Sequence, residues 1–363
     1  MSRHKSLSAP VQPGGTIGIL GGGQLGRMLA LAAARLGLKT HIYSDEDNAP
    51  AFQVSAFRTH AHYDNEAALA AFAGACDVVT FEFENVPSAT AEFLADHVPV
   101  NPSPKALAVC QDRLAEKNFV ASLGLKTPVF ASVASPNDAA AAIATVGTPA
   151  ILKTCRLGYD GKGQAKVASS DDIVKALAAF KGAPSILEAF VDFSFEASVV
   201  AARGADGIFA AYDPPENAHE NHILKRSTVP SRLSAAQVTE AKAIARKIAD
   251  AFGYVGVFAV ELFVGRDGSL LVNEIAPRVH NSGHWTIEAC IVSQFEQHIR
   301  AVAGWPLGDG SRHSDAVMEN LIGAEANDWK ALSARGGALH LYGKSQARAG
   351  RKMGHITWLK PKS

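Results

Sequence analysis

Residues 16–28 read TIGILGGGQLGRM, and this stretch decides how the first part of the chain folds. Its apolar start predicts a buried strand, and the three glycines that follow predict a tight turn. The apolar spacing after the turn predicts a helix over residues 24–36. Further strands are expected at residues 39–43 and 77–83. Because strands then alternate with helices, we predict an α/β fold with a doubly wound parallel sheet.

The domain boundaries follow from composition. The stretch VPVNPSP at residues 98–104 cannot be a helix interior, so the first domain is expected to close near residue 115. Beyond it, short strands and a helix that Ser234 caps indicate a second kind of architecture. We therefore expect a flexible leader at 1–15, a first domain at 16–115, a central domain at 116–306 and a C-terminal domain at 307–363.

Composition excludes several classes of protein. The 363 residues carry 35 basic and 35 acidic side chains, which argues against a general nucleic-acid binder. The chain contains no apolar run of about 18 residues, which a membrane-spanning helix needs. Its four cysteines include no C-x-x-C pair and read as reduced thiols. We expect a cytoplasmic protein with neither a nucleic-acid nor a membrane partner.

The glycines at 21, 23 and 26 fit the G-x-G-x-x-G pattern of a dinucleotide site, and Asp45 follows at roughly the ~20-residue spacing of a ribose-binding acid. This pattern keeps an NAD-dependent dehydrogenase open as an alternative function. The same glycines would also serve a tight turn alone, or a helix N-terminus that holds one anion.

A second glycine-rich segment, GYDGKGQ at residues 158–164, follows the expected strand that ends at Lys153. Its backbone N–H groups could reach phosphate oxygens, and Lys162 adds a positive charge. The spacing is not that of a P-loop, and an ordinary hairpin turn remains the alternative. A partly buried Lys153 would need an anion nearby, which favours a phosphate site.

Glu261 and Glu274 form the most informative pair. If Asp267-Gly268 is a two-residue turn, the two carboxylates face each other on neighbouring strands, about 4.5–5.5 Å apart. Such a pair repels unless a divalent cation lies between them, and hard oxygen ligands suit Mg²⁺. A slipped register that exposes both acids is the alternative. A metal role for Asn273 requires a β-bulge, because a strict ladder points it to the other face.

Residues 277–284, PRVHNSGH, directly follow this strand and gather a cation, two imidazoles and small polar side chains. Their nearness to Glu274 favours a site over a solvated loop. The pairs His60/His62 and His219/His222 lack a third ligand at useful spacing, so we assign no zinc site.

Six ordered segments together resemble the N5-carboxyaminoimidazole ribonucleotide synthase family of ATP-grasp enzymes. They are GGGQLGRM at 21–28, TFEFENVP at 80–87, GYDGKGQ at 158–164, EAFVDFSFEASV at 188–199, NEIAPRVHNSGHWT at 273–286 and YGKSQARAGRKMGH at 342–355. The resemblance implies a Rossmann-like pre-ATP-grasp domain, a two-lobed α+β ATP-grasp domain and a small β-rich C-terminal domain. It also implies a homodimer.

The resemblance further implies a reaction and its site. ATP would convert bicarbonate to carboxyphosphate, which then carboxylates aminoimidazole ribonucleotide (AIR) in purine biosynthesis. Asp160 would take the amine proton, and Arg278 and His280 would steady the bicarbonate oxygens. Glu261 and Glu274 would hold Mg²⁺. The implied ATP contacts are Arg113, Lys153, Gly158, Tyr159, Asp160, Gly161, Lys162, Gly163, Gln164, Glu188, Ala189, Phe190, Val191, Glu196, His219, Asn273 and Glu274. The implied AIR contacts are Gln24, Leu25, Glu84, Tyr159, Asp160, Asn281, Ser282, Lys344 and Arg351.

Two other functions remain open at this point. One is the dehydrogenase above, and the other is a protein that senses nucleotides without turnover. Separate titrations with NADH and ATP, followed by melting shifts, would distinguish the dehydrogenase. The sensor would bind ATP without bicarbonate-dependent turnover.

Overall fold

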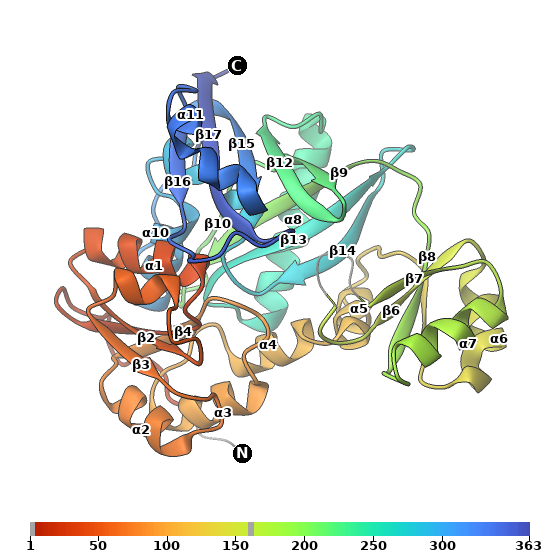
Figure 1. Ribbon diagram of the computed structural model, residues 1–363, viewed down its shortest axis with the longest axis horizontal. Coiled ribbons are helices and arrows are strands. Elements are labelled where there is room, and N and C mark those ends of the chain that lie inside the picture. The colour runs from red at the N-terminus through yellow and green to blue at the C-terminus, as the bar shows by residue number, and fades with distance from the viewer. Residues whose placement is uncertain (1–3, 159–162) are drawn as a thin grey trace.

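The computed structural model describes residues 4–158 and 163–363 (Figure 1). The first domain contains a parallel sheet, as predicted, and its strand order is β3-β2-β1-β4. Gly21 has φ +104° in the turn after β1, a conformation that glycine adopts readily. The elements are β1 (Thr16–Leu20), α1 (Gln24–Arg35), β2 (Lys39–Ser44), β3 (Phe57–His60), α2 (Glu66–Gly74), β4 (Val78–Phe81) and α3 (Ser88–His97).

Two helices lead from this domain to a separate small lobe, seen at the right of Figure 1. The lobe is an antiparallel sheet with the order β5-β8-β6-β7, and its core is buried beneath two helices. Its elements and the leading helices are α4 (Pro104–Cys110), α5 (Arg113–Ser122), β5 (Phe130–Val133), α6 (Ala139–Val146), β6 (Ala150–Thr154), β7 (Gln164–Val167), α7 (Ser170–Ala179) and β8 (Ser185–Ala189).

A long antiparallel sheet with the order β14-β13-β9-β11-β12-β15-β17-β16 forms the body of the molecule. Because β12 pairs with β15, this sheet runs without interruption past residue 307, where a new domain was expected. Its elements are β9 (Phe193–Arg203), β10 (Phe209–Ala211), β11 (Glu216–Glu220), β12 (Ile223–Val229), α8 (Ala235–Phe252), β13 (Gly256–Gly265), β14 (Leu270–Ala276), α9 (Thr286–Ala289), α10 (Gln294–Val302), β15 (Ser314–Ile322), α11 (Trp329–Ser333), β16 (Ala338–Leu341) and β17 (Lys352–Pro361). Short 3₁₀ turns occupy Pro50–Gln53, Pro136–Asp138, Asn281–Gly283 and Gly323–Asp328.

Helix α8 shows how local sequence sets these elements. Ser234 caps it by a reciprocal pair of hydrogen bonds with Gln237, as the sequence predicts. Gly253 ends it in the left-handed conformation. Its apolar face, which includes Ile244 and Ile248, is buried in the core that β9 and β13 share.

The leader differs from the expectation of a flexible tail. Val11 is only 5% exposed, and its backbone N–H donates to the Ala303 carbonyl. The Trp305 indole donates to the Val11 carbonyl at 2.7 Å, and the Lys5 backbone N–H donates to Ala95. Through these contacts residues 4–15 pack against both the first domain and the end of α10. Burial of the apolar Val11 side chain offsets the conformational entropy that is lost when the polar residues around it become ordered.

Candidate active site

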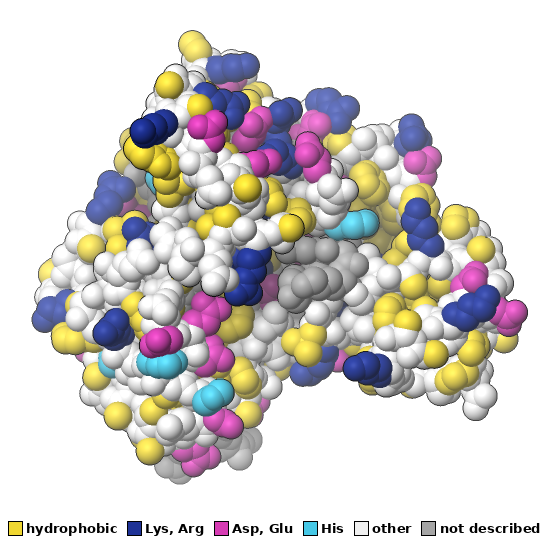
Figure 2. All heavy atoms as spheres, in the orientation of Figure 1, with side chains coloured by type: hydrophobic (Ala, Val, Ile, Leu, Met, Phe, Trp, Pro, Cys, Tyr) yellow, Lys and Arg dark blue, Asp and Glu magenta, His cyan; other side chains and the backbone are white. Residues whose placement is uncertain are grey.

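A cavity of about 840 Å³ lies where the body, the small lobe and α5 meet. In Figure 2 charged and histidine side chains gather along the junction of the body and the lobe. The structure brings many of the predicted residues to this one cavity. Its lining includes Glu84, Arg113, Lys153, Gly158, Gln164, Glu196, His219, Glu261, Asn273, Glu274, Arg278, His280 and Asn281.

Glu261 and Glu274 are direct cross-strand partners on β13 and β14. The pairing shifts at the next position, where Leu262 faces Val272 and leaves Asn273 as an extra residue. The strand therefore has a β-bulge at Asn273, which a metal role for this residue requires. The bulge turns Asn273 and Glu274 together towards the cavity, which both residues line.

The turn that joins these strands differs from the prediction. The Gly265 N–H donates to the Ser269 carbonyl, so the loop contains the three residues 266–268 and is not a two-residue Asp-Gly turn. Gly268 takes the left-handed conformation at φ +83° that such a loop needs. The extra loop residue and the bulge at Asn273 each shift the register by one, and the two shifts cancel at Glu261 and Glu274. The predicted pairing is therefore confirmed, although the predicted turn is wrong.

Both acids have cationic or hydrogen-bonding neighbours. Nε2 of His280 lies 3.1 Å from Oε1 of Glu261. Burial alone would raise the pKa of Glu261, but the hydrogen bond and charge of His280 outweigh it and lower this pKa to about 2. Glu274 pairs with Arg113 at 3.1 Å. The site thus keeps Glu261 as a carboxylate, the form that binds a cation.

A buried chain of hydrogen bonds lies behind His280. Oγ of Ser282 is 2.8 Å from Nδ1 of His280 and accepts from Ser198 at 2.7 Å. Asn217 then donates to Ser198, and Ser227 donates to Asn217. Ser282 is fully buried in this chain, and its expected role in binding AIR stays a prediction. In this structure Ser282 orients His280, because the imidazole ring can rotate only by losing this bond.

Arg278 joins the central domain to the first domain through an ion pair with Glu84. Burial favours the neutral form of Glu84, yet the Arg278 charge prevails and lowers the pKa of Glu84 to about 2. The pair lines the cavity beside His280, so a permanent cation stands next to the acid pair.

The small lobe supplies a second set of charges. Nζ of Lys153 pairs with Glu188 at 2.7 Å, and Glu188 is 2% exposed. The partly buried lysine thus has its anionic partner within the protein, so its burial does not by itself require a phosphate. The glycine-rich segment is the connection of the β6–β7 hairpin, and its ends Gly158 and Gln164 line the cavity.

Where the lobe joins the body, Phe190 is half exposed, and the backbone N–H groups of Ala189 and Phe190 donate within the lobe. Val191 follows at the same junction. On the body side of the cavity, Nδ1 of His219 lies 2.7 Å from Glu196. Burial alone would lower the pKa of His219, but Glu196 raises it.

Some predicted residues lie elsewhere. Gln24 begins α1, and Leu25 is buried in the core beside it. Among the described residues that line the cavity, Gln24, Leu25, Lys344 and Arg351 are not found. Lys344 stands near Arg351 and the buried Glu82; burial and the Arg351 charge lower its pKa to about 8. Tyr159, Asp160, Gly161 and Lys162 lie outside the described residues.

Sequence reasoning missed two buried residues of α5, Glu116 and Lys117, which bind the backbone of β14 on either side of Glu274. Their spacing from Arg113, three and four residues along a helix, places all three on one face and was the available signal.

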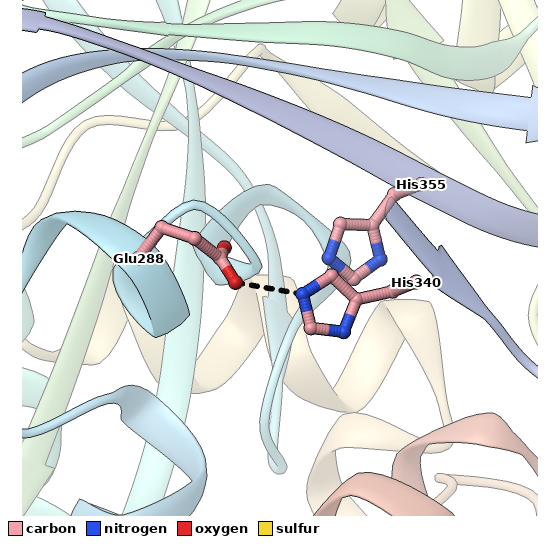
Figure 3. Close-up of side chains that lie close together, drawn as sticks. All are labelled: Glu288, His340 and His355. Atoms are coloured by element: carbon pink, nitrogen blue, oxygen red, sulfur yellow. Dashed lines mark hydrogen bonds and ion pairs between the residues drawn. The ribbon is translucent and has the colours of Figure 1, made fainter. Parts of the chain in front are cut away.

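It also missed a cluster in which Nε2 of His340 lies 2.7 Å from Glu288 (Figure 3). The rings of His340 and His355 stack at 4.4 Å with an angle of 8° between their planes. Because in-plane nitrogen lone pairs on parallel rings do not converge on one ion, this arrangement connects β16 and β17 to α9 and does not form a metal centre.

The central unit has two parts, a sheet that carries the acid pair Glu261 and Glu274 and a small lobe that carries Lys153, and the cavity lies between them. This arrangement defines an ATP-grasp protein, and residues 118–295 match the ATP-grasp domain model. Residues 15–111 match the ribonucleotide synthetase preATP-grasp domain, and residues 316–363 match the phosphoribosylaminoimidazole carboxylase C-terminal domain. The chain belongs to the N5-carboxyaminoimidazole ribonucleotide synthase family. The synthase of Brucella melitensis biotype 1 is 52% identical over 97% of this chain and 98% of its own length. That of Bacillus subtilis is 40% identical over 96% and 93%.

Solved structures agree with this assignment. The synthetase from Thermus thermophilus has a TM-score of 0.89 and 46% identity, over 95% of this chain and 93% of that one. The Aspergillus clavatus enzyme in complex with ADP and 5-aminoimidazole ribonucleotide has a TM-score of 0.90 and 34% identity, over 96% and 95%. None of the helices in the described part of the chain is long and apolar enough to cross a membrane.

Proposed function

We propose that the cavity around Glu261, Glu274 and Arg278 is the active site for ATP-dependent carboxylation of AIR with bicarbonate, the reaction of the family. The chain is an ATP-grasp carbon–nitrogen ligase. The observation that carries the site assignment is the paired register of Glu261 and Glu274, which places two carboxylates opposite each other in a cavity that Lys153 also lines.

The residues fit Mg²⁺ as the cation of the ATP complex. Oδ1 of Asn273 is buried and has no hydrogen-bond partner, and it belongs to the bulged residue that lines the cavity together with the two acids. Two carboxylates and an orphaned carbonyl oxygen are the hard ligands that Mg²⁺ prefers. When bound, the cation would neutralise charge on the transferring phosphoryl group.

We assign ATP to the interface of the lobe and the body. Lys153 and Arg113 supply positive charge for the phosphates, and Gly158 and Gln164, the described ends of the glycine-rich segment, line the same cavity. Residues 188–191 lie where the two parts join and would contact the base. Glu196 and His219 stand together on the body side of the cavity, suited to the ribose hydroxyls.

Two chemical steps follow. An oxygen of bicarbonate attacks the γ-phosphorus of ATP, and ADP leaves. The exocyclic amine of AIR then attacks the carbon of carboxyphosphate, phosphate leaves, and the amine proton passes to a base, for which we propose Asp160. Arg278 stabilises the oxygens that carry charge in both steps, and the bond from Ser282 keeps His280 oriented towards the same region.

AIR would enter between the first domain and the body, near Gln24, Glu84 and Asn281. Both polar atoms of the buried Asn281 amide lack partners, which suits a ligand contact. Lys344 and Arg351 would bind the ribonucleotide phosphate. We also propose a cytoplasmic homodimer, in keeping with the family.

The test is ADP release measured with and without AIR and bicarbonate. Release that requires both compounds, together with carboxylated product in equal amount, supports the proposal. ATP binding without such turnover would favour a nucleotide sensor.

A further inference from the structure

The open edge of β14 is covered by two buried ionisable side chains of α5. Strand β14 is the last in the order of its sheet, so one side of its backbone has no neighbouring strand. Glu116 and Lys117 lie against this side and are 3% and 1% exposed. Burial of two ionisable side chains is costly unless each has specific partners. Their partners therefore indicate what the pair does.

These partners are the backbone groups on either side of the bulge. Nζ of Lys117 donates to the carbonyls of Asn273, at 2.5 Å, and Val272, at 3.3 Å. Oε1 of Glu116 accepts from the backbone N–H of Ile275 at 2.7 Å. Asn273 and Glu274 face the cavity. Lys117 thus binds β14 at Val272 and Asn273, and its neighbour Glu116 binds it at Ile275, directly after Glu274.

A bulge removes ladder hydrogen bonds from its own strand and has to be stabilised by other groups. The simplest alternative pairing of β13 with β14 has no bulge. After Leu262 and Val272, each following residue of one strand then pairs with the next residue of the other. Asn273 would then face Glu261, and Glu274 would turn to the opposite face of the sheet. That slip would also move the carbonyl of Asn273 and the N–H of Ile275 away from α5.

We propose that Glu116 and Lys117 are positioning residues that hold the bulge of β14 in the register that presents Asn273 and Glu274 to the cation. This inference rests on the proposed function, because the cation belongs to the ATP complex. Lys117 also lies 3.8 Å from Glu188, so the same side chain contacts both the lobe strand β8 and the bulge. Neither residue is expected to contact the cation itself.

The experiment compares Lys117→Met with Glu116→Met and Glu116→Gln. Methionine removes the hydrogen-bonding group at either position, whereas glutamine keeps the oxygen that accepts from Ile275. The Mg²⁺ concentration for half-maximal ADP release is measured at saturating ATP, bicarbonate and AIR. ADP binding without Mg²⁺ and the melting temperature are measured for the same proteins. Lys175→Met, at an exposed position of α7, is the matched control.

Both methionine variants should need about 10- to 100-fold more Mg²⁺, the usual effect of removing a group that orients a metal ligand. Glu116→Gln should recover most of this loss, and ADP binding without Mg²⁺ should change little. A merely structural role would instead lower the melting temperature and ADP binding together, and glutamine would then have no special effect.

An unchanged Mg²⁺ requirement in Glu116→Met overturns the inference even if Lys117→Met does not fold. Failure of the proposed function is separate, because the unsubstituted protein would then show no ADP release that depends on AIR and bicarbonate.

Discussion

The Glu82 carboxylate binds the glycine turn that resembles a dinucleotide site, because it accepts a hydrogen bond from the Gly23 N–H at 2.7 Å. It also accepts from the Gly26 N–H at 3.0 Å. These are the groups with which such a turn would hold a pyrophosphate. The protein's own anion therefore occupies the place of the nucleotide phosphates. A β-carbon on Gly21 would clash with Cγ of Glu82, so the turn glycines make room for this side chain.

We expect NADH to produce no shift in melting temperature, whereas ATP with Mg²⁺ should raise it. Bound ligand stabilises by mass action, so ATP at about 100 times its Kd should add ~2.7 kcal/mol. The measurement is a pair of titrations followed by thermal melting. A shift with NADH that Glu82→Ala enlarges would restore the dehydrogenase alternative.

Glu274→Gln should reduce turnover at limiting Mg²⁺ on the order of 100-fold, because one of the two carboxylates that would hold Mg²⁺ is lost, and the bound cation would neutralise charge on the transferring phosphoryl group. The melting temperature without metal should change little, since the variant loses both the Arg113 ion pair and the repulsion from Glu261. Steady-state assays over a range of Mg²⁺ concentrations check this, and unchanged turnover would contradict the assigned metal site.

Oxygen from labelled bicarbonate should appear in the released phosphate, because a bicarbonate oxygen attacks the γ-phosphorus and stays bonded to it. Mass spectrometry of the phosphate measures the label. Phosphate that carries only solvent oxygen would exclude carboxyphosphate as the intermediate.

Arg351→Ala should raise the KM for AIR about tenfold or more, which corresponds to the ~1.5–3 kcal/mol of a charge-assisted hydrogen bond. The KM for ATP should stay nearly constant, because Arg351 is not among the residues that line the central cavity. Equal increases in both constants, or in neither, would return the basic run 344–352 to the status of a solvated surface.

Stability should fall with acid as the Glu84–Arg278 pair is lost. Arg278 overcomes the effect of burial and holds the pKa of Glu84 at about 2, below its ordinary 4.5. A depressed folded-state pKa contributes stability above pH 4.5, and this contribution declines as pH falls from 4.5 towards 2. Urea unfolding can be measured at about pH 6 and about pH 3, on either side of the ordinary glutamate pKa. The difference in free energy of unfolding between Glu84→Gln and the unsubstituted protein should be smaller at the lower pH. An equal difference at both pH values would argue against the pair.

The sequence by itself determined the local elements and the chemistry of the site. The strand, glycine turn and helix at residues 16–35 and the Ser234 cap follow from short-range rules of periodicity and capping, which need no distant contact. The ordered motifs likewise indicated which side chains would gather, and much of the expected set lines one cavity.

Only the tertiary structure decided the features that depend on long-range packing. The packed leader depends on Trp305, nearly three hundred residues away along the chain. The place of Ser282 behind His280 depends on Ser198, which lies on β9, more than 80 residues earlier in the chain. The agreement at Glu261 and Glu274 arose from two errors that cancel, a longer turn and a bulge. The bulge could not be read from β14 alone, because the groups that bind its backbone, Glu116 and Lys117, are side chains of a helix more than 150 residues earlier in the chain.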